Sequence, residues 1–192
     1  LNNNGKLTGF NTDGIGYMMS VKDAGFDIIG KKMTLLGAGG AASAICVQAA
    51  LDGVSEIDVY SIKDNFWDRA VKLIDSINKN TDCKASLYEF NDVASFKKSV
   101  ASSAILTNGT SVGLAPDSHN CPVSDTSVLR QGLIVSDVIY NPRETKLLSL
   151  AKAAGCHTFN GMYMLLYQGA EAFKIWTGHD MPVDTVKSQF FS

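Results

Sequence analysis

The chain alternates short apolar runs with longer stretches in which apolar residues recur at helical spacing. Short runs of three to seven residues rich in apolar and β-branched side chains predict strands, and they lie at residues 32–36, 56–60, 84–88, 104–107, 133–139 and 157–159. Helical spacing precedes the first run and follows every run except the one at 104–107, and it predicts helices at residues 12–24, 40–51, 65–78, 92–101, 144–154, 162–176 and 183–191. Strands that alternate with helices form βαβ units, so we expect an α/β fold with one parallel, doubly wound sheet and helices on both faces. Six strands suit the order 3-2-1-4-5-6.

Composition narrows the class of protein without fixing its chemistry. The 192 residues are 45% hydrophobic and 19% charged, with a net charge of −2, which gives no basic surface for a nucleic acid. The four cysteines have neither CxxC nor metal-ligand spacing, so we expect reduced thiols, a cytoplasmic protein and no metal site. Residues 33–51 carry no charge, but three glycines break this stretch, and a strand, turn and helix explain it better than a membrane span.

The first predicted strand runs directly into a glycine-rich turn that opens a helix. The turn reads Gly37-Ala38-Gly39-Gly40-Ala41-Ala42, the alanine-ended form of the GxGxxG dinucleotide fingerprint. Glycine at the first two positions permits the tight turn and a close approach of a pyrophosphate, and the helix N-terminus offers free N–H groups. We therefore predict a Rossmann-type nucleotide site here, with a purely structural tight turn as the alternative.

The segment after the second strand bears on the choice of cofactor. It reads Tyr60-Ser61-Ile62-Lys63-Asp64. Asp64 can bond the ribose hydroxyls, as acids after this strand do in NAD-binding proteins, or it can cap the next helix. Lys63 can meet a phosphate or remain solvated.

Further polar residues stand where loops are expected at the carboxyl edge of the sheet or beside it. Each has a structural alternative: a helix N-cap for Thr12 or Asp13, a polar turn for residues 108–111, a strand end for Tyr140. Gly161 begins a long apolar helix, in which Gln168 is a polar amide that needs a partner. The loop from residue 108 to 126 is long for a compact domain, and such loops often carry function.

Taken together, these segments resemble the C-terminal half of the shikimate/quinate dehydrogenase family. The resemblance covers nearly the whole chain and rests on five segments, which are residues 9–14 (GFNTDG), 36–41 (LGAGGA), 107–110 (TNGT), 140–142 (YNP) and 160–170 (NGMYMLLYQGA). It implies an NAD(P)-dependent oxidoreductase on the route to chorismate and the aromatic amino acids, which reversibly oxidises a ring hydroxyl of shikimate or quinate. It also implies a two-domain protein, of which residues 1–192 are the C-terminal cofactor domain; because the chain starts at Leu1 and not at Met, we expect the N-terminal substrate domain to be missing.

The resemblance assigns roles to residues. Asp13 matches the aspartate of the catalytic Lys–Asp pair, and Thr12, Asp13, Tyr140 and Gln168 match substrate contacts. The matching cofactor contacts are Gly37, Ala38, Gly39, Gly40, Ala41, Ser61, Ile62, Lys63, Asp64, Thr110, Ser111, Val138, Tyr140 and Gly161.

The chain departs from the family pattern at two points, which concern the choice of cofactor and the catalytic lysine. NADP-specific members carry Asn-Arg-Thr after the second strand, and here Ser61-Ile62-Lys63 lacks the arginine, so we expect NAD to be favoured and NADP to remain possible. The catalytic lysine belongs to the N-terminal domain, so the isolated chain should bind nucleotide but hardly turn over substrate. We expect a small-molecule substrate, no nucleic-acid or membrane partner, and a monomer or homodimer. The alternatives are a non-catalytic dinucleotide-binding or sensor domain and another type of Rossmann enzyme.

Overall fold

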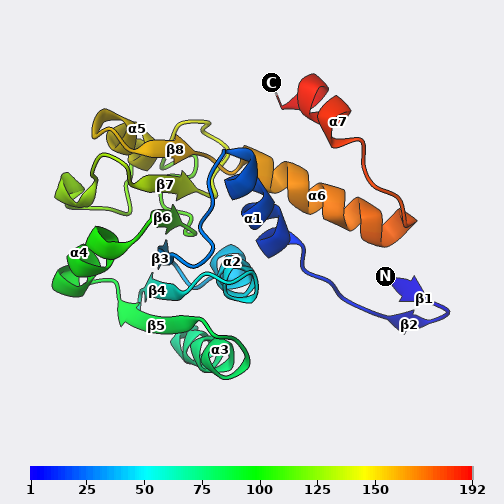
Figure 1. Cartoon of the computed structure of the whole chain (residues 1–192), viewed down its shortest axis with the longest axis horizontal. Helices are drawn as coiled ribbons and strands as arrows, with labels where there is room; N and C mark the ends of the chain where they lie inside the picture. The colour runs from blue at the N-terminus through cyan, green and yellow to red at the C-terminus, as the bar shows by residue number, and fades with distance from the viewer. Residues whose placement is uncertain (192) are drawn as a thin grey trace.

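The computed structural model describes residues 1–191, and a six-stranded parallel sheet forms its centre (Figure 1). The strands stand in the order β5-β4-β3-β6-β7-β8, which is the predicted order 3-2-1-4-5-6 counted from the first strand of this sheet. Their bounds are β3 Lys32–Leu36, β4 Glu56–Ser61, β5 Lys84–Glu89, β6 Ile105–Asn108, β7 Ile134–Asp137 and β8 His157–Phe159. The predicted α/β class and doubly wound topology are confirmed.

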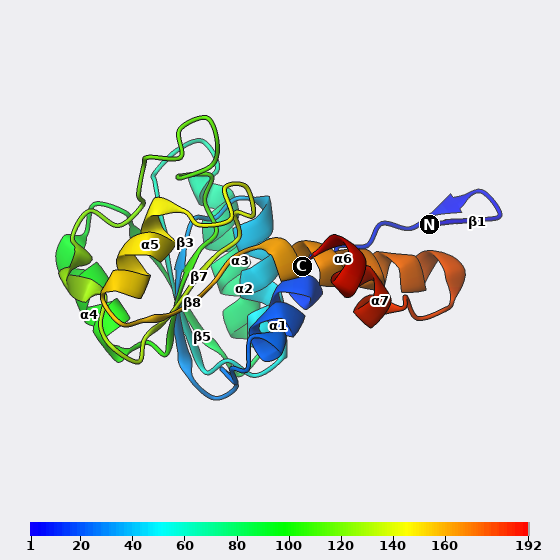
Figure 2. The same cartoon turned by 90° about the horizontal axis from the view of Figure 1, so that it is seen from above.

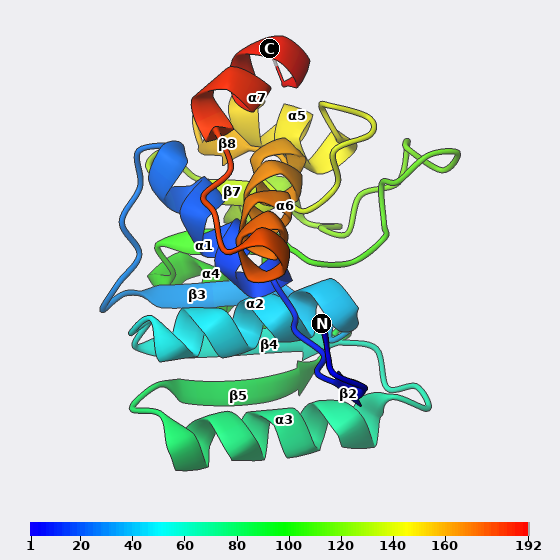
Figure 3. The same ribbon diagram turned by 90° about the vertical axis from the view of Figure 1, so that its right-hand side faces the viewer.

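Helices cover both faces of the sheet (Figure 2). Helices α4 and α5 lie on one face, whereas α1, α2 and α3 lie on the other, with α6 and α7 outside α1 (Figures 2 and 3). A buried apolar cluster fills each interface, as expected for a sheet buried on both sides. The helix bounds are α1 Asp13–Asp23, α2 Gly40–Leu51, α3 Trp67–Asn80, α4 Val93–Ser102, α5 Lys146–Ala153, α6 Met162–Thr177 and α7 Val183–Phe190.

Apart from shifts of one residue at strand ends and of one or two residues at helix ends, the structure differs from the predicted elements at three places. Strand β7 ends at Asp137 rather than at residue 139, because the Asp137 carboxylate accepts a hydrogen bond from Ile139 N and turns the chain. A hairpin, β1 Asn2–Asn3 and β2 Lys6–Leu7, lies in the polar opening segment, where no strand is predicted. Its turn residues Asn4 and Gly5 both have positive φ, at 51° and 87°, as a two-residue Asn-Gly hairpin turn requires. A short 3₁₀ helix, Thr126–Val128, follows the long loop.

Helix α1 lies between α2 and α6 because two glycines on different sides allow both neighbours to approach. A Cβ on Gly14 would overlap the carbonyl oxygen of Ala44 in α2, and a Cβ on Gly16 would lie 2.6 Å from the backbone nitrogen of Gln168 in α6. The Tyr17 hydroxyl fixes the helix to the sheet through hydrogen bonds to Thr107 Oγ1 at 2.6 Å and Ser136 Oγ at 2.9 Å. Burial of this phenol raises its pKa to about 12.

The charge-free stretch at residues 33–51 forms β3, a turn and α2, as predicted. Within residues 1–191, no helix is both long and apolar enough to span a membrane. All four cysteines are free thiols, of which Cys46 and Cys83 are buried.

Candidate functional site

The loops that follow five strands of the parallel sheet meet along its carboxyl edge. They come after β3, β4, β6, β7 and β8, and each carries residues predicted from the sequence to bind cofactor. In open α/β sheets, ligands bind in the crevice at this edge, where the strand order reverses. Here the reversal falls between β3 and β6, so the loops after these two strands form the centre of the candidate site.

The glycine turn after β3 has the geometry of an anion-binding turn. Gly37 has φ +96° and donates a backbone hydrogen bond to Tyr60 O at 2.7 Å, which ties the turn to β4. Gly39 is the N-cap of α2, and a Cβ on Gly39 or Gly40 would meet no atom within 4 Å. No side chain caps α2, so the N–H groups of its first turn, together with the helix dipole, face open space that an anionic group can occupy.

The loop after β6 packs directly beneath this turn. Gly109 N donates to Leu36 O at 2.8 Å, and a Cβ on Gly109 would lie 2.8 Å from the Cβ of Ala42. The Thr110 hydroxyl donates to Asn108 Oδ1 at 2.6 Å, while Ser111 is exposed. Thr110 therefore shapes the loop, and Ser111 presents its hydroxyl to solvent.

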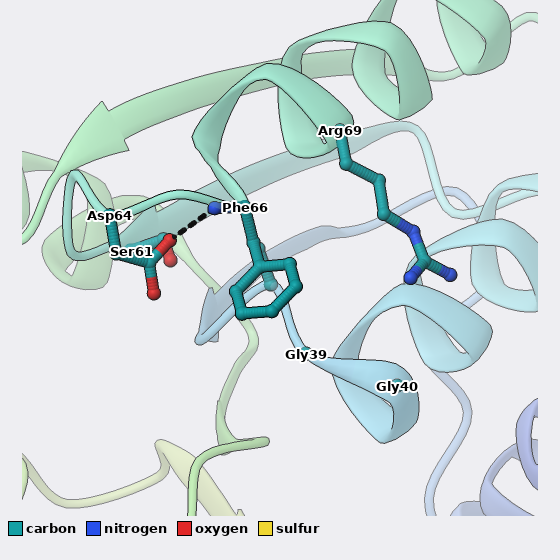
Figure 4. Close-up of a pocket in the computed structure, with 7 residues that line it drawn as sticks. Gly39, Gly40, Ser61, Asp64, Phe66 and Arg69 are labelled. Carbon is teal, nitrogen blue, oxygen red and sulfur yellow. Dashed lines mark hydrogen bonds between the residues drawn. The ribbon is translucent and has the colours of Figure 1, made fainter.

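A cavity of about 220 Å³ lies between the glycine turn and the loop after β4 (Figure 4). Asp64 accepts a hydrogen bond from Phe66 N at 2.8 Å, so its carboxylate forms a turn directly before α3. It does not cap the helix, because the N-cap of α3 is Phe66 and no side chain caps it. The phenyl ring of Phe66 lies between Asp64 and the side chain of Arg69, which extends toward the first turn of α2 (Figure 4). The lining residues are Ala38, Gly39, Gly40, Ser61, Asp64, Phe66 and Arg69.

Two predicted residues of the same loop do not line this cavity. Ile62 is 64% exposed. Lys63 forms an ion pair with Glu89 at 3.3 Å and stands over the ring of Trp67, 5.9 Å from the ring centroid. The cation that does line the cavity is Arg69, which is not among the predicted residues because it lies within α3, beyond the loop where NADP-specific members carry arginine. Its spacing of three residues from Phe66 places both side chains on one helix face, and that spacing is the signal that would have found it.

The loops after β6 and β7 are joined by the buried carboxylate of Asp137. Its Oδ1 accepts from Asn108 Nδ2 and from Ile139 N, both at 3.1 Å, and its Oδ2 accepts from the Thr145 hydroxyl at 2.8 Å. Burial raises the pKa of this carboxyl group, and the three hydrogen bonds oppose that rise. Asp137 therefore holds the two loops that carry Thr110 and Tyr140 in one arrangement.

Replacing Asp137 by asparagine tests this role. The amide oxygen can keep two of the three donors, but the amide nitrogen faces Thr145, whose hydroxyl must then accept instead of donating. We expect the free energy of unfolding to fall by about 1 kcal/mol, measured by chemical denaturation. Asp75→Asn, on the exposed face of α3, is the control and should change it by less than about 0.5 kcal/mol. Equal effects of the two substitutions would contradict the proposed role.

Helix α6 begins against the loop after β7. A Cβ on Gly161 would overlap the carbonyl oxygen of Val138, and Gly161 N donates to Ile139 O at 3.1 Å. Only glycine permits this contact, and it places the N-terminus of α6 beside Val138 and the half-exposed Tyr140. These three predicted cofactor contacts are thus brought together.

The predicted substrate contacts Thr12, Asp13 and Gln168 come from α1 and α6. The Thr12 hydroxyl donates to Gln168 Oε1 at 3.4 Å, and Gln168 Nε2 donates to Leu165 O at 3.0 Å. Asn11 Oδ1, not Thr12 or Asp13, accepts the hydrogen bond from the backbone at the start of α1. No ion pair among residues 1–191 involves Asp13. Thr12 occupies the N-cap position of α1, but its side chain makes no capping hydrogen bond. The side chains of Thr12 and Asp13 are both half-buried, and Thr12 contacts Gln168.

Comparison with known proteins finds a matching family model and close relatives of this chain. A family model described as the shikimate 5'-dehydrogenase C-terminal domain matches residues 161–189. The chain is 52% identical over 191 residues to a curated protein of Listeria monocytogenes named shikimate dehydrogenase (NADP(+)), and the match covers all of this chain and 66% of that protein.

Solved structures agree with this match. The crystal structure of shikimate 5-dehydrogenase from Listeria monocytogenes in complex with shikimate and NAD superposes with a TM-score of 0.94 at 52% identity, over 98% of this chain and 65% of that one. Quinate dehydrogenase from Corynebacterium glutamicum in complex with NAD gives a TM-score of 0.83 at 28% identity, over 97% of this chain and 64% of that one.

The comparisons correct the expectation that NAD is the favoured cofactor. The curated relative at 52% identity is named for NADP(+), although NAD is bound in the solved Listeria structure. The expectation rested on the absence of arginine at Ile62 and on Asp64 as a ribose ligand. The structure shows why both arguments were weak, because Arg69 brings a cation to the cavity from α3 and Asp64 bonds the backbone of Phe66.

The chain spans slightly less than two thirds of the length of the curated relatives it matches. Along that span, the fold agrees with the resemblance seen in the sequence. The chain belongs to the shikimate/quinate dehydrogenase family.

Proposed function

We propose that this chain is the cofactor-binding domain, and part of the substrate site, of an NADP-dependent shikimate dehydrogenase. The observation that carries the proposal is the contact of Thr12 with Gln168 beside the unpaired Asp13, on a nucleotide-binding sheet. A non-catalytic nucleotide sensor would have use for the glycine turn but none for this polar group between α1 and α6. The names of relatives at 51% and 52% identity support the same activity.

The residues present fit a dinucleotide along the carboxyl edge of the sheet. The first turn of α2 would receive the pyrophosphate through free N–H groups. Ser61 and Asp64 line the cavity beside this turn, where the adenosine ribose would lie. The nicotinamide would lie at the other end of the crevice, near Val138, Tyr140 and Gly161. NADP, when bound, supplies the acceptor for the hydride that leaves the substrate carbon.

The substrate site would use the polar groups of α1 and α6. Thr12 and Gln168 can each donate to or accept from a ring hydroxyl, and several such bonds hold a polyhydroxylated ring at a fixed distance from the cofactor. As hydride leaves the carbon, the hydroxyl proton must pass to a base. The Asp13 carboxylate would orient that base and the reacting hydroxyl. The base itself, a lysine in this family, would come from the portion of the relatives that the chain does not span.

Two measurements test the proposal. Calorimetric titration of the 192-residue chain with NADP⁺ should show binding, while the isolated chain should show no detectable shikimate oxidation. The chain joined to the segment that precedes it should reduce NADP⁺ when shikimate is added, with quinate as the comparison substrate. Absence of nucleotide binding at millimolar concentration would overturn the cofactor role. Nucleotide binding without turnover of either substrate by the joined protein would favour the sensor alternative.

A further inference from the structure

Arg69 is the cation that faces the cavity at the adenosine end of the crevice. It lies in the first turn of α3, and its side chain extends toward the first turn of α2, where Gly40 lies (Figure 4). No ion pair within residues 1–191 involves its guanidinium, which is exposed. A positive charge without a carboxylate partner, beside a helix N-terminus, makes this end of the cavity attractive to an anion.

The opposite wall of the cavity carries a negative charge instead of a positive one. Asp64 lies there, and the ring of Phe66 stands between its carboxylate and Arg69 (Figure 4). An anionic group therefore favours the Arg69 side, and neutral hydroxyl groups suit the Asp64 side. A ribose with a phosphate on one carbon and a free hydroxyl on the next fits both walls. Its phosphate would face Arg69, and its hydroxyl would face Asp64.

The other nearby cation is already engaged. Lys63 is paired with Glu89 at 3.3 Å and lies over the ring of Trp67. Ile62 stands at the position where the NADP-specific pattern has arginine, and it is 64% exposed with no charge to offer. Within this cavity, only Arg69 among the lining residues carries a positive charge.

We propose that Arg69 recognises the 2'-phosphate of NADP and is the specificity-determining residue of this chain for that phosphate. This inference rests on the proposed function, since it assumes a dinucleotide in the crevice. The guanidinium would donate to the phosphate oxygens from α3, and the first turn of α2 would face the same group. The positive charge that NADP-specific members place at the position of Ile62 would then come from Arg69 in α3.

The test uses two small nucleotides that differ only in the phosphate concerned, 2',5'-ADP and 5'-AMP. Calorimetry on the 192-residue chain should give a dissociation constant at least about tenfold lower for 2',5'-ADP. The substitution Arg69→Ala should abolish this preference and leave the affinity for 5'-AMP within about twofold. The preference should also weaken as salt is raised, because an exposed ion pair is screened.

Three further variants separate Arg69 from general effects of charge. Lys72→Ala removes a cation from the same helix one turn further on, and Lys63→Ala removes the cation paired with Glu89; both should keep the preference. In the Arg69→Ala background, Ile62→Arg should restore it, since it returns a cation to the loop. A circular dichroism spectrum and melting temperature like those of the original chain would show that each variant is folded.

The possible failures are distinguishable. Equal binding of the two nucleotides by the original chain, or a preference that survives Arg69→Ala, would overturn the role of Arg69 and leave the proposed dehydrogenase intact. If Lys63→Ala lost the preference for 2',5'-ADP and Arg69→Ala kept it, the phosphate would be bound by Lys63. That result would also overturn the proposed role of Arg69. Failure of the original chain to bind either nucleotide, or NADP⁺, would overturn the proposed function itself.

Discussion

Replacing Gly16 by alanine is expected to lower the free energy of unfolding by about 3 kcal/mol. The new Cβ would lie 2.6 Å from the backbone nitrogen and 2.8 Å from the Cβ of Gln168, and 2.7 Å from the carbonyl oxygen of Met164. These are mostly backbone atoms of α6, so no side-chain rotation can relieve the overlap. Helices α1 and α6 must separate, which opens an interface that holds Thr12 against Gln168. Chemical denaturation of the 192-residue chain measures the loss.

Gly169→Ala is the matched control. Gly169 lies in α6, one residue beyond Gln168, and a Cβ there would meet no atom within 4 Å. Alanine is the better helix former by about 1 kcal/mol in a helix interior, so this variant should be as stable as the original chain or slightly more stable. If Gly16→Ala lowered stability no more than Gly169→Ala, the close approach of α1 and α6 would not be what stabilises this region.

The sequence predicts the sheet well because its signals are local. Strands β3, β6 and β7 lie within compact apolar runs, β4 alternates apolar and polar residues, and polar or glycine-containing segments separate the strands. The end of β7 was misplaced because apolar periodicity does not report the side chain of Asp137, which bonds Ile139 N and ends the strand early. The Asn4-Gly5 turn of the β1–β2 hairpin is the opposite case, in which a strong local turn signal was present and was not used.

The residues of the candidate site could be predicted from the sequence only where they lie within a recognisable local motif, such as a strand end or a helix start. The glycine turn and Gly161 are such residues, since the turn follows a strand and Gly161 opens a helix. Arg69 was missed because its place in the cavity depends on how α3 packs against α2, which is a tertiary relation. Asp137 was missed for a related reason, because its three partners come from residues 2, 8 and 29 positions away.

The positions of Gly14 and Gly16 connect the fold to the proposed chemistry. Helix α1 carries Thr12 and Asp13 at its N-terminal end, and its two close contacts, to α2 and to α6, lie within one turn of these residues. Helix α2 begins at the glycine turn, and α6 begins directly after its N-cap, Gly161. The first turn of α1 is therefore held between the two helices whose N-termini lie at the crevice, and this fixes where Asp13 stands relative to both of them.

Replacing Asp13 by asparagine in the protein joined to its preceding segment is expected to reduce kcat for shikimate oxidation by about 10²- to 10³-fold. Asparagine keeps the shape and one acceptor oxygen, so hydroxyl binding is retained in part and KM should rise less than about tenfold. The loss falls on kcat because a neutral amide cannot stabilise the charge that develops on the base when it takes the hydroxyl proton. A steady-state assay at saturating NADP⁺ separates the two constants.

Two observations distinguish this role from a structural one. Asp23→Asn changes a carboxylate at the other end of α1, where it is paired with Lys187 at 2.7 Å, and kcat should stay within about twofold of the original value. NADP⁺ affinity and the free energy of unfolding should be nearly unchanged in Asp13→Asn, because no ion pair within residues 1–191 depends on Asp13. A kcat that survives Asp13→Asn, or falls equally in Asp23→Asn, would remove Asp13 from the mechanism, since the carboxylate at the start of α1 would then contribute no more than any other charge on that helix.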